Sequence, residues 1–413
     1  MIFKYFLNKL ALLKTKVMMI LIINSFSWYF PLYIFFVNVL DSLQIEYNAL
    51  LVIYLFHYLA IIVSAFIGNI LVRRFNRYNL LLSWMIIGIL ASLSVLLTKT
   101  ARIELISAIS ILLGLSLGLG FPTCLAYFAD NVDINHRGSV GGFVFFIAFI
   151  GMCIIGFLST VLSYMATVLF FTIWRGVGLA IFMLFNSKNF ESIKVTEISY
   201  KAILHKKSFV LYYIPWIMFC LVNFLEIPFF DFQLQQYFLG TNVRYLISIS
   251  EFGIGGLSAM VCGLLSDLIG RKRIIIFAYT IVGIGYAALS FAFSSPFIFY
   301  LYVVLDGVAW GVFALMFYFI IWGDIAENYP KEKIYLLGTL PFLISSFLSF
   351  FVTPYAQIFP LFTAFSLASF FLFLAVIPLM YAPETLPEKT VRERELRSYI
   401  EKAKRIREKF TKG

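Results

Sequence analysis

Four charged residues stand inside long apolar segments of this sequence. Three are acids, Glu226, Glu251 and Asp306, and the fourth is Arg175. An unpaired charge at the centre of a bilayer costs about 2.5 to 3.5 kcal/mol, so these residues should be paired, protonated or exposed to water. A carboxyl group buried near another favours its protonated form, which makes Glu226 and Asp306 candidate proton carriers. For Glu251 and Arg175 a structural and a functional role are both open.

Polar and aromatic side chains accompany these acids at helical spacing. Asn223 lies three residues before Glu226, and Trp310 lies four residues after Asp306. Residues three or four apart share one face of a helix, so both acids and the tryptophan could face one site. The alternative is a structural role, in which the acids make local hydrogen bonds or pair with Arg175 across the bundle.

A second polar and aromatic patch lies in the first apolar segment and contains Asn24, Ser27, Trp28 and Tyr29. It could form the wall opposite the acids, although aromatic residues make up 19% of the chain and such patches are common in it. His57, in the middle of the second apolar segment, is expected to be a packing residue rather than a proton relay.

One short run, GLLSDLIGRKR at residues 263–273, concentrates charge at the end of an apolar segment. Gly263 allows close helix packing, Gly270 allows a tight turn, and the basic residues suit lipid headgroups. Asp267 is best explained by a partner, either the arginines beside it or the positive N-terminal end of another helix. The alternative is a helix end that its charges anchor to lipid.

The composition identifies the elements that must position these residues. The chain has 413 residues, 48 of them Phe, and a mean hydropathy of +0.94, far from the usage of soluble proteins. Apolar segments of about 20 residues, long enough to cross a bilayer as helices, recur along it. An all-α membrane protein with twelve transmembrane helices is predicted, the helices lying at residues 17–40, 49–71, 79–98, 103–128, 139–163, 165–185, 209–231, 243–266, 274–294, 297–323, 334–355 and 357–381.

Lysines and arginines are distributed unevenly among the connections between these helices. Loops on one side of the membrane carry only Lys99, Arg102 and Arg244, whereas nearly all others lie in the termini and the remaining loops. The positive-inside rule therefore predicts a multi-pass protein of the cell membrane with both termini in the cytoplasm. The net charge of +11 suits anionic membrane lipids better than nucleic acid, and a monomer is expected.

Motifs for catalysis and cofactor binding are not found in the sequence. The four cysteines, at 124, 153, 220 and 262, lie singly in apolar segments, without the spacing that metal ions or redox exchange require. The glycine-rich run at 114–122 lacks the ending of a phosphate-binding loop and is expected to serve close helix packing. With no Ser/His/Asp set or metal-ligand cluster either, neither an enzyme nor a cofactor is expected.

A polar connection divides the twelve helices six and six. The predicted units are a basic amphipathic segment (1–16), a first six-helix bundle (17–185), a cytoplasmic linker (186–208), a second six-helix bundle (209–381) and a basic, helical tail (382–413).

An internal repeat is expected from these two halves. Residues 68–78, GNILVRRFNRY, hold the place in the first half that 263–273 hold in the second. With Gly68 aligned to Gly263, Val72 stands where Asp267 does. The first copy therefore lacks the acid.

Over residues 1–390 the chain resembles the major facilitator superfamily. The Gly-x-x-x-Asp-x-x-Gly-Arg-Lys signature of that family is matched by Gly263, Asp267, Gly270, Arg271 and Lys272. Weaker matches in register with the twelve helices are His136-Arg137-Gly138 in loop four-five, Gly323-Asp324 with Pro330-Lys331 in loop ten-eleven, and Ala382-Pro383-Glu384-Thr385-Leu386-Pro387 after helix twelve.

The resemblance implies two bundles related by a pseudo-two-fold axis, with helices one, four, seven and ten around a central cavity. Glu226 and Asp306 would lie on lining helices of the second half. It also implies secondary active transport of a small organic solute by alternating access, and the acids indicate proton coupling. Two alternatives stay open: proton-driven export of organic cations, and a transporter-like sensor that binds a solute without moving it.

The symmetry of that fold brings loop eight-nine to the start of helix five. Asp267 is then expected to contact Arg137 and the positive end of that helix at Gly138, and so to hold the cytoplasmic side closed. Because Val72 cannot make the equivalent contact, this one site is expected to carry most of the cytoplasmic latch.

Overall fold

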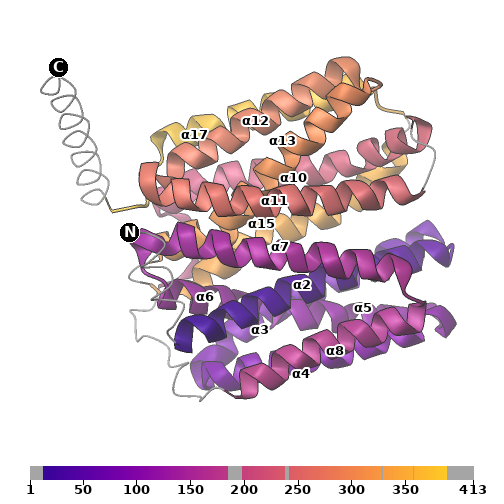
Figure 1. The fold of residues 1–413 in the computed structure, drawn as a ribbon, viewed down its shortest axis with the longest axis vertical. Coiled ribbons are helices and arrows are strands. Elements are labelled where there is room, and N and C mark those ends of the chain that lie inside the picture. Colours follow the sequence, from indigo (N-terminus) through magenta and orange to yellow (C-terminus); the bar gives the residue numbers. More distant parts are fainter. Residues whose placement is uncertain (1–12, 185–197, 238–240, 327–328, 357, 388–413) are drawn as a thin grey trace, which may run out of the picture.

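The computed structural model describes residues 13–184, 198–237, 241–326, 329–356 and 358–387, and every regular element in these ranges is a helix (Figure 1). The first half contains α2 (Leu13–Ser42), α3 (Tyr47–Arg74), α4 (Arg77–Ser94), η1 (Val95–Thr100), α5 (Ile103–Gly118), α6 (Phe121–Asn131), η2 (Ile134–His136), α7 (Arg137–Val161) and α8 (Tyr164–Met183). The linker contains α9 (Tyr200–Leu204). The second half contains α10 (Lys207–Tyr237), α11 (Thr241–Ile269), α12 (Arg271–Ala292), α13 (Pro296–Ala314), η4 (Leu315–Ile320), α14 (Ile321–Ile325), α15 (Lys331–Val352), η5 (Thr353–Tyr355), α16 (Leu361–Leu374) and α17 (Val376–Tyr381).

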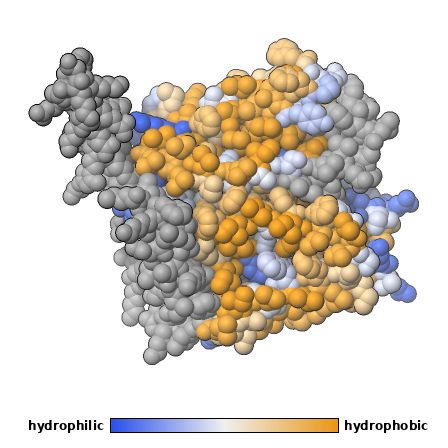
Figure 2. Space-filling model, in the orientation of Figure 1, coloured by the Kyte–Doolittle hydropathy of each residue, from blue (hydrophilic) through white to orange (hydrophobic). Residues whose placement is uncertain are grey.

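Twelve helical stretches are long and apolar enough to span a membrane, as predicted. Helices are the expected outcome, because a backbone surrounded by lipid must satisfy its polar groups within the segment. Large apolar side chains are exposed along these stretches, and Figure 2 shows apolar residues over much of the face in view. Residues 1–12 and the tail after Pro387, for which an amphipathic segment and a helix are predicted, lie outside the described residues.

The two halves repeat one series of helices. The starts of two pairs of corresponding helices differ by 194 in residue number: Arg77 and Arg271, and Arg137 and Lys331. This repetition agrees with the two predicted six-helix bundles. The ends of α3 and α11, at Arg74 and Ile269, differ by 195, which is the separation that aligns Val72 with Asp267.

Three pairs of helices form the main contacts between the halves. α7 packs along α11 (Figure 1), and α15 packs against both α3 and α6. The first pair approaches closely because glycines face each other: a Cβ atom at Gly263 would lie 3.1 Å from the Gly142 Cα atom. Close packing was the expectation for Gly263.

Two spans are irregular near the middle of the molecule. The fourth span breaks at Gly120, between α5 and α6, and Pro122 occupies the first turn of α6. The tenth span contains η4, a π-helical segment of six residues, in which the wider turn changes the backbone hydrogen bonding. The Tyr335 hydroxyl donates to the Phe319 carbonyl of that segment at 2.8 Å.

Candidate functional site

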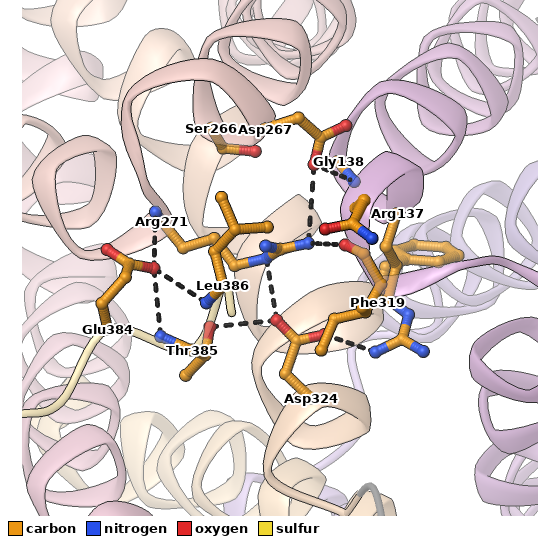
Figure 3. A network of polar contacts seen from close by, with 12 residues as sticks. Arg137, Gly138, Ser266, Asp267, Arg271, Phe319, Asp324, Glu384, Thr385 and Leu386 are labelled. Atoms are coloured by element: carbon orange, nitrogen blue, oxygen red, sulfur yellow. Dashed lines mark hydrogen bonds and ion pairs between the residues drawn. The ribbon is translucent and has the colours of Figure 1, made fainter. Parts of the chain in front are cut away.

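Charged side chains tie the two halves together at one end of the bundle, which we call the charged end. Arg137, at the start of α7 in the first half, forms an ion pair with Asp324 in the second half. The Arg271 Nε atom lies 2.8 Å from Asp324 Oδ2, so one buried carboxylate holds two arginines (Figure 3). Arg137 Nη2 also donates to the Ala129 carbonyl at 2.8 Å.

Asp267 caps the N-terminus of α7. Its carboxylate accepts a hydrogen bond from the backbone of Gly138 at 2.9 Å (Figure 3). It also accepts from the Ser139 backbone at 2.7 Å and from the Ser139 hydroxyl at 2.6 Å. A Cβ atom at Gly138 would stand 2.6 Å from Asp267 Oδ1, so glycine is required there. The expected position of Asp267 is therefore confirmed. The expected contact between Asp267 and Arg137 is wrong, because Arg137 forms its ion pair with Asp324. The arginine that contacts Asp267 is Arg271, at 3.5 Å.

Glu384 caps a second helix at the same end. Its carboxylate accepts from the backbone of Arg271 at 3.0 Å and of Lys272 at 3.2 Å, at the start of α12. Gly270, just before this start, has a φ of +102°, which glycine adopts without strain. The Lys272 side chain donates to the Met380 carbonyl at 2.7 Å and so binds within the second half.

A second set of charges joins the halves on the other side of the charged end. Arg77 forms ion pairs with Asp130, at 3.0 Å, and with Glu332 of the second half. Lys331 Nζ lies 2.5 Å from Asp130 Oδ1 and also crosses between the halves. Asp267 is therefore not the only acid that joins the halves at this end.

The two sets of charges are copies of one arrangement. Arg77 and Arg271, Asp130 and Asp324, and Arg137 and Lys331 form three pairs, each separated by 194 residues. In both sets an aspartate pairs with the arginine of its own half and with the base that begins a helix of the other half.

The acids at the two latches are placed reciprocally. The second half has Asp267 near the end of α11, and the facing helix α7 carries Gly138 at its start. The first half has no acid at the position that corresponds to Asp267, and the facing helix α15 carries Glu332 where α7 has Gly138. An acid therefore lies at the positive N-terminal end of both α7 and α15. For α7 the acid is Asp267 of the opposite half, and for α15 it is Glu332 of the helix itself.

The linker helix α9 joins this end of the molecule. The Asn69 side chain donates to the Tyr200 hydroxyl, and the Lys333 ammonium lies 5.3 Å from the centre of the Tyr200 ring. Lys206 donates to the Ile325 carbonyl at 3.0 Å. A cytoplasmic linker was predicted, and its described part binds both halves.

The three membrane acids gather in the second half. Glu226 of α10, Glu251 of α11 and Asp306 of α13 all interact electrostatically with Tyr286 of α12. Glu226 and Asp306 are 7% and 4% exposed. The three acids thus approach the same tyrosine of α12, and none of them is among the residues that line the central cavity described below.

Asn223 and Trp310 meet between α10 and α13. The indole nitrogen of Trp310 donates to Asn223 Oδ1 at 3.1 Å. The helical spacing therefore identified two side chains that do come together, next to the helices that carry the acids.

Arg175 lies in the first half, far from these acids in the fold. Its guanidinium is sandwiched between Trp28 and Trp84, 4.4 and 4.6 Å from the ring centres, and donates to Asn24 at 2.9 Å and Ser25 at 3.0 Å. Its described contacts include no acid, so the alternative pairing of Arg175 with Glu226 or Asp306 is not observed.

The prediction that Asn24 and Trp28 form the wall opposite the acids is contradicted by these contacts. Both side chains point into the first bundle, because α8 packs against α2, Asn24 accepts from Arg175 of α8, and Trp28 donates to Ser92 of α4 at 2.8 Å. His57 is buried as expected and contacts the Tyr29 hydroxyl and the Ser110 carbonyl, each at 3.0 Å.

Between the halves, a cavity of about 20 Å³ lies in the middle of the molecule. Its lining comes from both halves: Phe30, Ile61, Ala65, Leu117, Gly118, Phe121, Pro122, Tyr318, Thr339, Phe342 and Leu343. Tyr318 stands out, because it belongs to η4 and its hydroxyl is buried without a hydrogen-bond partner.

Sequence reasoning missed Arg77, Asp130, Glu332 and Tyr318. A signal for Asp130 existed, because Asp130 precedes Arg137 by seven residues and Asp324 precedes Lys331 by seven. That repeated spacing relates the acid and the base of each set. No comparable pattern marks Tyr318, which the packing of other helices places at the centre.

The sequence model of the Major Facilitator Superfamily matches residues 17–321. No curated protein matches the sequence. The solved structure of the proton:xylose symporter XylE, bound to 6-bromo-6-deoxy-D-glucose, is similar to this chain with a TM-score of 0.69 and 13% identity, over 90% of this chain and 96% of that one. That of the E. coli fucose:proton symporter FucP gives 0.67 and 8%, over 89% and 98%. Since the family match covers most of the chain, the protein belongs to the major facilitator superfamily.

Proposed function

We propose that this protein is a proton-coupled secondary transporter that moves a small organic solute across the cell membrane by alternating access. The charged end is its cytoplasmic side, which the distribution of Lys and Arg supports. Two similar halves joined at that end by ion pairs suit a mechanism in which the halves part on one side at a time. Two proton symporters share the fold.

One observation carries the proton coupling. Glu226 and Asp306 are buried in membrane-spanning helices, and each has a carboxylate oxygen without a hydrogen-bond partner. No ion pair among the described residues involves either of them. Two ionised carboxylates in such surroundings would be costly, whereas protonated ones are tolerated. A conformation that admits water to them would let the protons leave.

Proton coupling can be tested with two acid variants in proteoliposomes. Glu226→Gln and Asp306→Asn keep the shape of each side chain but remove its titration. With an internal pH dye and a panel of labelled solutes, each variant should lose proton uptake that accompanies solute entry by at least about tenfold. Exchange of labelled for unlabelled solute should be kept in part.

Glu104→Gln is the matched control, because Glu104 is an exposed acid at the start of α5. It should leave proton uptake unchanged. If both Glu226→Gln and Asp306→Asn retain normal solute-driven proton uptake, the assignment of these acids is refuted.

A further inference from the structure

We propose that the solute is a small neutral molecule, mostly apolar or aromatic, that binds at the central cavity and takes the Tyr318 hydroxyl as its main polar partner. This inference rests on the proposed transport function, since it names the class of solute that the transporter would carry.

The position of the cavity is the first support. It lies between the halves, and its lining includes Phe30 and Phe121 of the first half and Tyr318 and Phe342 of the second. A site built from both halves can be approached from either side when the halves part alternately.

The surroundings of Tyr318 are the second support. Four rings from four other helices surround it, with ring centres 6.1 Å away for Phe26, 6.0 Å for Phe121, 6.0 Å for Trp216 and 5.8 Å for Phe342. Its hydroxyl is buried without a partner, which costs free energy that a hydrogen-bonding ligand would restore. Rigid aromatic rings around one polar group favour a flat apolar ligand.

The same lining argues against sugars and ions. No charged side chain lines the cavity, and its second hydroxyl, that of Thr339, donates to the Leu336 carbonyl of its own helix at 3.0 Å. A sugar would leave several hydroxyl groups without partners, and sites that cannot pair a polar group reject it strongly. Asp306 lies twelve residues before Tyr318, about 18 Å along the helix, too far to neutralise a bound cation.

The size of the cavity sets when binding occurs. About 20 Å³ holds a single water molecule, so an aromatic ligand enters only when the halves separate and the rings around Tyr318 move. The π-helical turn that carries Tyr318 is a place in the tenth span where such a movement can be absorbed.

Calorimetric titration of the full chain in nanodiscs, with protein-free nanodiscs subtracted, tests this directly. The probes are benzyl alcohol, ethylbenzene, which replaces the hydroxyl by a methyl group, D-xylose and benzyltrimethylammonium. Benzyl alcohol should bind best. Tyr318→Phe should lower the affinity for benzyl alcohol about three- to tenfold, the effect of one hydrogen bond, and leave the affinity for ethylbenzene unchanged.

Tyr279→Phe is the matched control, because Tyr279 also has a buried hydroxyl without a partner but does not line the cavity. Tyr279→Phe should leave the affinities for benzyl alcohol and for ethylbenzene unchanged. Tighter binding of xylose or of the cation, binding of none of the probes, or equal effects of the two tyrosine variants would each overturn the inference. Binding is measured without a proton gradient, so failure of this inference can be distinguished from failure of the proposed transport function.

Discussion

Buried charges in this protein differ most in what surrounds them. Asp324 holds two arginines, whereas Glu226 and Asp306 have no basic partner among the described residues. Arg175 has no acid among its described contacts, and two tryptophans and the Asn24 side chain stabilise it. The buried charges therefore fall into three kinds: paired with opposite charges, stacked on aromatic rings, and without a charged partner among the described residues.

A stability prediction follows for Arg175. Arg175→Lys should destabilise the protein by about 1 to 3 kcal/mol, because an ammonium cannot stack as a flat group between Trp28 and Trp84 and leaves Asn24 poorly paired. Unfolding in mixed detergent would measure the loss. Arg102→Lys, at an exposed position, should cost almost nothing. Normal stability combined with lost transport would instead give Arg175 a functional role.

At the scale of helices, the important feature is that one acidic side chain lies at the N-terminus of α7 and another at the N-terminus of α15. Asp267 serves α7 from the opposite half, and Glu332 serves α15 from within that helix. Both acids also lie beside the arginine that begins α12 or α4. The charged end is therefore held by two latches of similar chemistry.

Removing one charge at a time should open this end by comparable amounts. Asp267→Asn and Glu332→Gln should each shift the population toward the open state by several-fold to about thirtyfold, since an acid at a helix N-terminus contributes about 0.3 to 2 kcal/mol. A cysteine at Thr339, in a background without the native cysteines, would report opening through its reaction with an impermeant reagent. In the double variant the two shifts should multiply.

Asp133→Asn is the control for these variants, because Asp133 caps η2 at the same end without joining the halves. Reactivity at position 339 should then stay unchanged. If Glu332→Gln also left it unchanged while Asp267→Asn raised it, the latch would be a single site after all.

The helices could be predicted from sequence far better than the contacts between them. Twelve apolar segments and the contact of Asp267 with the start of α7 follow from local patterns. The direction in which Asn24 and Trp28 point could not be predicted, because an apolar helix carries no stripe of polar residues that distinguishes lipid, bundle interior and cavity. The position of the three acids near α12 likewise depends on how the helices pack.

For the whole molecule, the separation of 194 residues is the strongest description of the architecture. It relates helix starts, ion pairs and the two aspartates at the charged end. The acids at Glu226 and Asp306 and the aromatic centre around Tyr318 have no equal in the first half, where Cys124 stands at the position that matches Tyr318. The repeated positions thus include the ion pairs at the charged end, whereas Glu226, Asp306 and Tyr318 belong to the second half alone.

The central claim is that a proton gradient drives accumulation of a solute. Proteoliposomes of the wild-type chain, acidic outside, should concentrate a labelled solute from the panel above its external level, and a protonophore should abolish that excess. Equal internal and external concentrations whatever the gradient, or binding to the protein with no entry, would contradict the claim.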